Sequence, residues 1–453
     1  MSFRKNLLAA RHHFIFLLGL AAAFGLVIYL EMLEVSRENF KIEEKIKITY
    51  PSSRELNEVE QEMARIAWRY FENNTDEDTG LVNSVDGFPA ATLWDIASYM
   101  LGLISAYKLD IVDADTFDSR IEKLLKSLYE LDLYDGVLPN KSYNVKTKRM
   151  VDYTNKISDN GIGWSAIDIG RIMVPFNILV WNYPQHTKGV NRILSRWDMT
   201  YLVSRGVLVG ATIDKKGKTK YVQEGRIGYE EYAAKSVSLA GIDVSVALQY
   251  SDFLKYVPIM GVDVPTDIRD PKKYKAHNYV VSESYILDAI EFGSDEISTQ
   301  FSYRVYKAQE NRYKKTGILT AVSEDNIDQA PYFVYNTVFS SGKAWNAITD
   351  SGEDASQFRS VSTKAALGWH MLYESDYTAL LMKHIENNFD SEKGWFSGIY
   401  EKSNVPNKAI TANTNAIVLE SLHYKVFGPL LNISGKNNAN KLDLLSVGKK
   451  MKS

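Results

Sequence analysis

The chain has 453 residues, of which 45% are hydrophobic and 24% are charged, and its formal net charge is −3. This composition is that of a globular protein with a large core, and the balanced charge provides no basic field for binding nucleic acid. The absence of cysteine excludes disulfides, thiolate metal ligands and a cysteine nucleophile. The few histidines are not spaced as paired ligands on a helix, so we expect neither a histidine-built metal site nor a cofactor.

An uncharged stretch near the N-terminus, FIFLLGLAAAFGLVIYL, runs from Phe14 to Leu30 and follows three basic residues. As a helix it spans about 25 Å, close to the lower limit for crossing a bilayer. The charge asymmetry predicts a cytoplasmic segment at 1–13, a transmembrane anchor at 14–32 and a single-pass inner-membrane protein whose main domain is periplasmic. A cleaved signal peptide is the alternative.

The rest of the chain divides into three parts by composition. Residues 33–52 are strongly charged and predict a stalk, and residues 433–453 are rich in asparagine and lysine and predict a flexible tail. Residues 53–432 predict the folded domain.

Apolar residues recur at helical spacing through most of this domain. The predicted helices are 55–71, 94–107, 121–131, 164–174, 228–239, 283–292, 297–309, 363–373 and 376–385. Strand signals are sparse, and residues 207–213 and 221–223 predict one small β-hairpin. The pattern therefore indicates an all-α domain.

A short motif occurs near both ends of the domain. Glu72–Asp76 with Gly80 recurs as Glu386–Asp390 with Gly394, and each copy follows a predicted helix. Two matched helix-loop units favour a closed ring of helical hairpins. The alternative is two unrelated acidic turns.

The stretch YVQEGRIGYEEYAAK, residues 221–235, gathers carboxylates, glycines and aromatic rings. Glu224 precedes a glycine and is expected in a loop, with Arg226 and Tyr229 as polar neighbours. Glu231 lies in the first turn of the next predicted helix, where helix capping would also explain it. A polar cluster among aromatic rings is typical of a sugar-binding site.

Two further acids lie among aromatic or apolar neighbours. Asp95 has capping-box spacing from Thr92, which would explain it structurally, but Trp94 and Tyr99 flank it. Asp168 lies within an otherwise apolar predicted helix, where an unpaired charge would be costly. Arg171, three residues on, could pair with it.

Glycosidic bond hydrolysis needs one carboxyl group to protonate the leaving oxygen and one carboxylate to attack or to activate water. The acids with the most suggestive surroundings, and hence the candidate catalytic residues, are Glu224, Glu231, Asp168 and Asp95. The candidate substrate-binding residues are Trp94, Tyr99, Trp164, Arg226, Tyr229, Glu283, Tyr285, Glu324, Asp325, Tyr400 and Glu401.

Several stretches resemble one bacterial family, the domain of unknown function 3131 proteins associated with exopolysaccharide systems. They are TLWDIASY, LPNKSYN, GIGWSAIDIGR, QEGRIGYEEYAAK, TGILTAVSEDNID, STKAALGW, GIYEKSN and TANTNAIVLESL. More distantly, GWSAIDIGRIMVP and GYEEYAAKSVSLAG resemble glucoamylase-like six-hairpin proteins, including β-1,2-glucanases.

The resemblance implies an (α/α)6 toroid that acts on a polysaccharide or oligosaccharide, and it points to Asp168 and Glu231 as positions of cleft acids. Glu224 and Glu231 thus remain alternatives for the general acid. We expect a glycoside hydrolase acting on an exopolysaccharide or β-glucan, with a glycan synthase or secretion complex as a possible partner. The alternatives are a non-catalytic glycan-binding or scaffold subunit and, less favoured, a polysaccharide lyase.

Overall fold

The structure is a computed structural model that describes residues 16–27, 48, 50–214, 216–269 and 277–431. The chain separates into two compact units, Met1–Ile46 and Lys47–Ser453. The expected segment 1–13, most of the expected stalk and the whole of the expected tail lie outside the described residues.

In the first unit, residues 16–27 form an exposed helix. Twelve helical residues span roughly 18 Å, less than the hydrocarbon core of a bilayer. Among the residues that the structure describes, no helix combines the length and the apolar character needed to cross a membrane. This finding contradicts the predicted transmembrane anchor and the predicted single-pass inner-membrane location. The flanking residues 14–15 and 28–32 of the predicted span lie outside the description.

Helices form the frame of the second unit, and most lie where the apolar periodicity predicted them. Among the described residues of the predicted domain, the two helices that the periodicity missed are α7 and α14. The helices are α3 (Glu58–Asn74), α4 (Leu93–Lys108), α5 (Ala114–Glu130), α6 (Ala166–Asn182), α7 (Thr187–Leu194), α8 (Tyr229–Leu239), α10 (Glu283–Leu287), α11 (Glu296–Thr316), α12 (Thr363–Leu372), α13 (Asp376–Ile385) and α14 (Ala412–Phe427).

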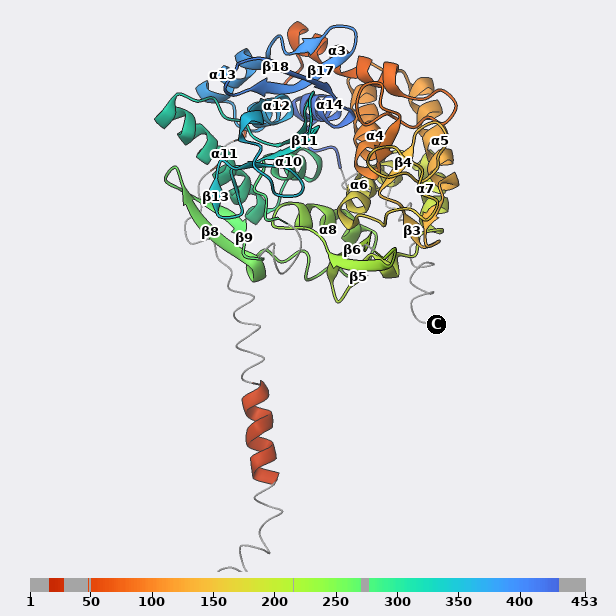
Figure 1. The fold of residues 1–453 in the computed structure, drawn as a ribbon, viewed down its shortest axis with the longest axis vertical. Coiled ribbons are helices and arrows are strands. Elements are labelled where there is room, and N and C mark those ends of the chain that lie inside the picture. The colour runs from red at the N-terminus through yellow and green to blue at the C-terminus, as the bar shows by residue number, and fades with distance from the viewer. Residues whose placement is uncertain (1–15, 28–47, 49, 215, 270–276, 432–453) are drawn as a thin grey trace, which may run out of the picture. The chain divides into compact units, whose positions relative to one another are not determined.

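Six of these helices pack side by side in a ring. The order is α4, α6, α8, α10, α12 and α14, and α14 packs against α4 to close the circle (Figure 1). The first and last helices of the ring are thus neighbours although they are far apart in sequence. Helices α3, α5, α7, α11 and α13 lie outside the ring (Figure 1).

Short strands occupy many of the connections between helices. They form seven small antiparallel sheets within the described residues. Their bounds are β1 (Ala90–Thr92), β2 (Leu133–Tyr134), β3 (Leu138–Pro139), β4 (Ser142–Asn144), β5 (Val203–Ser204), β6 (Val207–Ile213), β7 (Thr219–Gln223), β8 (Leu254–Ile259), β9 (Val262–Asp267), β10 (Glu324–Asn326), β11 (Phe333–Asn336), β12 (Phe339–Ser340), β13 (Lys343–Ala344), β14 (Ala347–Ile348), β15 (Ser360–Ser362), β16 (Phe389–Asp390), β17 (Gly394–Tyr400) and β18 (Pro406–Ile410).

The predicted all-α class is therefore wrong, because the domain combines helices with many small sheets. Of the strands, the hairpin of β6 and β7 is the one the sequence predicted. Most of the others are two to four residues long, too short to show the alternation that identifies a strand. They are specified by partners elsewhere in the chain, as where β1 pairs with β4 and β15 pairs with β17.

The first copy of the acidic motif includes the last turn of α3 and the second follows α13, and in each the chain then turns back on itself. The first closes through a bridge between Thr75 and Val82, and the second through the pairing of β16 with β17. The two motifs are thus equivalent ends of helices outside the ring.

Local capping determines where three predicted acids lie. Asp95, Asp168 and Glu231 each occupy the third position of a ring helix, α4, α6 and α8 respectively. Asp95 reaches back to the Thr92 N–H at 2.9 Å, and Glu231 accepts from the Gly228 N–H at 2.7 Å. A carboxylate in the first turn is favoured by the helix dipole.

Candidate active site

Asp168 and Glu224 meet at the N-terminus of α6. Glu224 follows β7, and its Oε2 accepts a hydrogen bond of 2.6 Å from the N–H of Ala166, the first residue of the helix. The Ser165 hydroxyl donates to Asp168 Oδ1 at 3.0 Å. The two carboxyl groups are therefore held by neighbouring residues of the same helix end, and burial and the charge of Glu224 both act on Asp168. We call them the α6 acid pair.

A glycine makes room for this pair. Gly210 in β6 lies beside Glu224, and a β-carbon at that position would be 2.2 Å from the Glu224 carboxyl carbon. Since such contacts do not occur between real side chains, the bare backbone of Gly210 is what allows the carboxylate to reach Ala166.

The α6 acid pair holds a proton near neutral pH. Burial, followed by the charge of Glu224, raises the pKa of Asp168 to about 7. Burial also raises the pKa of Glu224, although Lys141 and the Ala166 N–H oppose that rise. Both side chains keep partial access to solvent. Desolvated acids that remain reachable suit proton transfer to a bound substrate.

A second acid group surrounds Lys364 of α12. The Lys364 ammonium pairs with Glu283 of α10 and lies 3.5 Å from Asp325 of β10. The neighbouring Glu324 accepts a hydrogen bond from the Tyr229 hydroxyl. Burial and the charge of Glu283 raise the pKa of Glu324 to about 8, and burial raises that of Asp325 to about 6. We call these residues the Lys364 group.

Asp95 connects the two sets of acids. Its charge raises the pKa of Asp168, and its own pKa is raised by burial and by Glu283. Next to it, the Trp94 indole N–H donates to Asn413 Oδ1 at 3.3 Å, and the Asn413 amide donates to Glu283 at 2.9 Å. Ring helices α4, α6, α10, α12 and α14 thus all contribute to one acidic region.

A buried ion network lies among the ring helices. The Arg171 guanidinium pairs with Glu291 and Glu420, and all three side chains are fully buried. Arg171 also lies 5.2 Å from the centre of the Trp94 ring. Arg171 therefore pairs with Glu291 and Glu420, whereas Asp168 accepts a hydrogen bond from Ser165.

The other predicted residues have different surroundings. Glu231 is 2% exposed and caps α8, with the charge of Glu230 adding to burial in raising its pKa. The aromatic residues Tyr99, Trp164 and Tyr285 are buried in the core. Arg226 donates to Gln223 at 2.9 Å, Glu401 pairs with Arg312 and Arg359, and the Tyr400 hydroxyl donates to Asp328 at 2.6 Å.

The sequence reasoning missed Lys141, Lys364 and Asn413. Each lies inside a stretch that carried the family resemblance, namely LPNKSYN, STKAALGW and TANTNAIVLESL. Their presence in these stretches was the sequence signal that could have identified the three residues. Their roles depend on contacts with residues more than 80 positions away, such as the pairing of Lys364 with Glu283.

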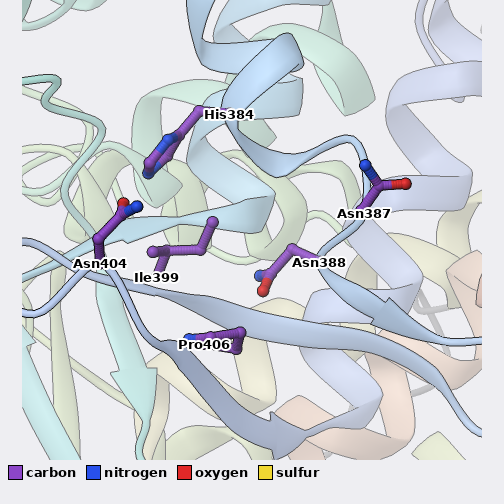
Figure 2. A pocket seen from close by; sticks show the side chains of 6 residues that line it. All are labelled: His384, Asn387, Asn388, Ile399, Asn404 and Pro406. Carbon is purple, nitrogen blue, oxygen red and sulfur yellow. The ribbon is translucent and has the colours of Figure 1, made fainter.

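A small pocket lies apart from these acids, between α13, β17 and β18 (Figure 2). It has a volume of about 150 Å³ and is lined by His384, Asn387, Asn388, Ile399, Asn404 and Pro406. No carboxylate lines it, so it does not provide the acid chemistry. Within the described part of the chain, no group of three or more candidate ligands is arranged to hold a metal ion.

Solved structures with a similar fold are glucoamylase-like proteins. A candidate glucoamylase from Bacteroides fragilis is 12% identical, with 88% of this chain and 99% of that chain covered and a TM-score of 0.60. An endo-β-1,2-glucanase from Chitinophaga pinensis, in complex with sophorotriose and glucose, is 11% identical, with 85% and 97% covered and a TM-score of 0.61. A variant endo-β-1,2-glucanase from Talaromyces funiculosus, with β-1,2-glucan, is 10% identical, with 87% and 88% covered and a TM-score of 0.58.

These similarities show that the domain shares the fold of these glucoamylase-like and endo-β-1,2-glucanase structures. Residues 62–428 match the family described as protein of unknown function (DUF3131), and the chain belongs to this family. The predicted resemblance is confirmed. No curated protein matches the sequence.

Proposed function

We propose that the protein is a glycoside hydrolase that cleaves a bacterial β-glucan or exopolysaccharide, with β-1,2-glucan as the first substrate to test. The observation that carries the proposal is the α6 acid pair, in which Asp168 has a pKa of about 7 beside Glu224. A carboxyl group that is protonated near neutral pH, next to one held by a helix N-terminus, is the combination that glycosidic hydrolysis requires. The likeness to glucanase folds supports this choice of substrate.

In the proposed reaction, Asp168 donates its proton to the glycosidic oxygen as the bond to the anomeric carbon breaks. Ser165 holds the Asp168 carboxyl group in place at 3.0 Å. Glu224 is the ionised partner, because the Ala166 N–H and Lys141 favour its charged form. As the ionised partner, Glu224 would either attack the anomeric carbon, with water then releasing the sugar, or take the proton from a water that attacks it.

The test is reducing-end release from β-1,2-glucan and other β-glucans by the full chain. Asp168→Asn and Glu224→Gln should each reduce release by at least about 100-fold while leaving glycan binding in place. Glu231→Gln is the matched control, because it neutralises a buried acid that caps α8 and should keep most of the activity.

Two outcomes would overturn this assignment. Loss of turnover in Glu231→Gln, with activity retained in Glu224→Gln, would move the catalytic role to Glu231. Binding without release by the wild-type protein on every glycan would make the chain a non-catalytic glycan-binding subunit. In that case the same carboxyl groups would serve as acceptors for sugar hydroxyls.

A further inference from the structure

Tyr279 and Tyr335 form a stacked aromatic pair beside the acids. Their ring centres are 3.8 Å apart and the planes differ by 3°. Both residues are partly exposed, although a stacked pair of this kind would normally serve to fill a core. Tyr335 also packs edge-on against Phe333, with ring centres 5.1 Å apart, which fixes its orientation. A rigid, accessible aromatic surface is suited to stacking against the apolar face of a sugar ring.

The strand register places this pair next to Glu324. In the antiparallel pairing of β10 with β11, Tyr335 is directly opposite Glu324. Side chains of directly opposed residues lie on the same face of a sheet, about 5 Å apart at their β-carbons. The Tyr229 hydroxyl bonds Glu324 as well, and Tyr229 packs edge-on against Trp94 at 5.6 Å. Aromatic side chains thus flank the Glu324 carboxyl group.

The charge of this region restricts what can bind there. The Lys364 group contains three acids, Glu283, Asp325 and Glu324, and one cation. Lys364 is buried and already pairs with Glu283. A glycan that carries carboxylate or sulfate groups would therefore be repelled, and would find no free cationic partner in the Lys364 group.

We propose that Tyr279 and Tyr335 form a stacking subsite for one unit of an uncharged glycan, beside the Glu324 carboxyl group. The proposal deepens the proposed function and rests on it for the position of the scissile bond. The two rings are contributed by separate segments, one before α10 and one before α12, so the subsite exists only in the folded domain.

The experiment measures glycan affinity in the Asp168→Asn background of the full chain, so that binding is separated from turnover. The probes are a neutral β-1,2-glucan oligosaccharide and the same oligosaccharide after carboxymethylation. Tyr279→Ala and Tyr335→Ala should each weaken binding of the neutral probe by about tenfold, and Tyr335→Phe should bind like the parent. Tyr221→Ala is the control, because it removes a tyrosine ring that is 54% exposed and packs against Trp164.

The outcomes separate this inference from the proposed function. Binding that the two alanine variants weaken, in a protein that never releases sugar, would support the subsite and overturn the hydrolase. Turnover by the wild-type chain with unchanged KM and affinity in both alanine variants would overturn the subsite alone. Equal or tighter binding of the carboxymethylated probe would refute the preference for an uncharged glycan.

Discussion

Replacing Gly210 with alanine should displace Glu224 without touching its chemistry. The added β-carbon would lie 2.2 Å from the Glu224 carboxyl carbon and from one of its oxygens. Ordinary contacts between such atoms are at least about 3.4 Å, so the carboxylate must move by roughly 1 Å or more. That movement would break the 2.6 Å hydrogen bond from the Ala166 N–H. A misplacement of this size in a catalytic group costs on the order of 100-fold in rate.

The assay compares kcat and KM for glycan cleavage by the wild type, Gly210→Ala and the double variant Gly210→Ala/Glu224→Asp. We expect kcat to fall by about 100-fold in Gly210→Ala with little change in KM. The shorter aspartate frees space for the new methyl group, so the double variant should recover thermal stability. Wild-type kinetics in Gly210→Ala would refute the reasoning that this carboxylate acts from its position on α6.

Three further predictions concern charge. Because the proton donor must be protonated, kcat/KM should decline tenfold per pH unit above about pH 7, which is the pKa of Asp168. A pH profile of kcat/KM that stays flat to about pH 9 would exclude Asp168 as the donor. Since folding raises this pKa, the folded state binds more protons than the unfolded state, and the stability that Asp168 contributes at low pH is lost as pH rises through about 7. Asp168→Asn should therefore unfold at a higher temperature than the wild type at pH 8 but not at pH 4. We expect its free energy of unfolding at pH 8 to rise by about 1–2 kcal/mol after solvent screening. Equal shifts in unfolding temperature at both pH values would contradict this prediction. Arg171→Met removes the cation that pairs with buried Glu291 and Glu420, and it should lower the free energy of unfolding in urea by about 3–5 kcal/mol. A decrease below about 1 kcal/mol would show that the stability of the network does not depend on Arg171.

The sequence by itself located features that depend on neighbours along the chain. Helices such as α3, α8 and α13 lie close to the predicted ranges, because their apolar residues repeat at helical spacing. The capping role suggested for Asp95 is present, because Thr92 is within reach through one turn of backbone. The family was also recognisable from contiguous stretches of residues.

The tertiary structure decided what depends on residues distant in sequence. The predicted all-α class failed because short strands such as β1 and β15 are specified by partners in other parts of the chain. The predicted membrane anchor failed because the described helix at 16–27 does not have the length that the apolar stretch suggested.

The tertiary structure also distinguishes the two candidate acids of the site, because their surroundings depend on residues distant in sequence. In sequence, Glu224 and Glu231 were equivalent candidates seven positions apart. Folding buries Glu231 as a helix cap and brings Glu224 to the N-terminus of α6, beside an aspartate 56 residues earlier in the chain. Burial and the charge of Glu224 then raise the pKa of Asp168, and neither effect exists until the segment that carries Glu224 has packed against α6.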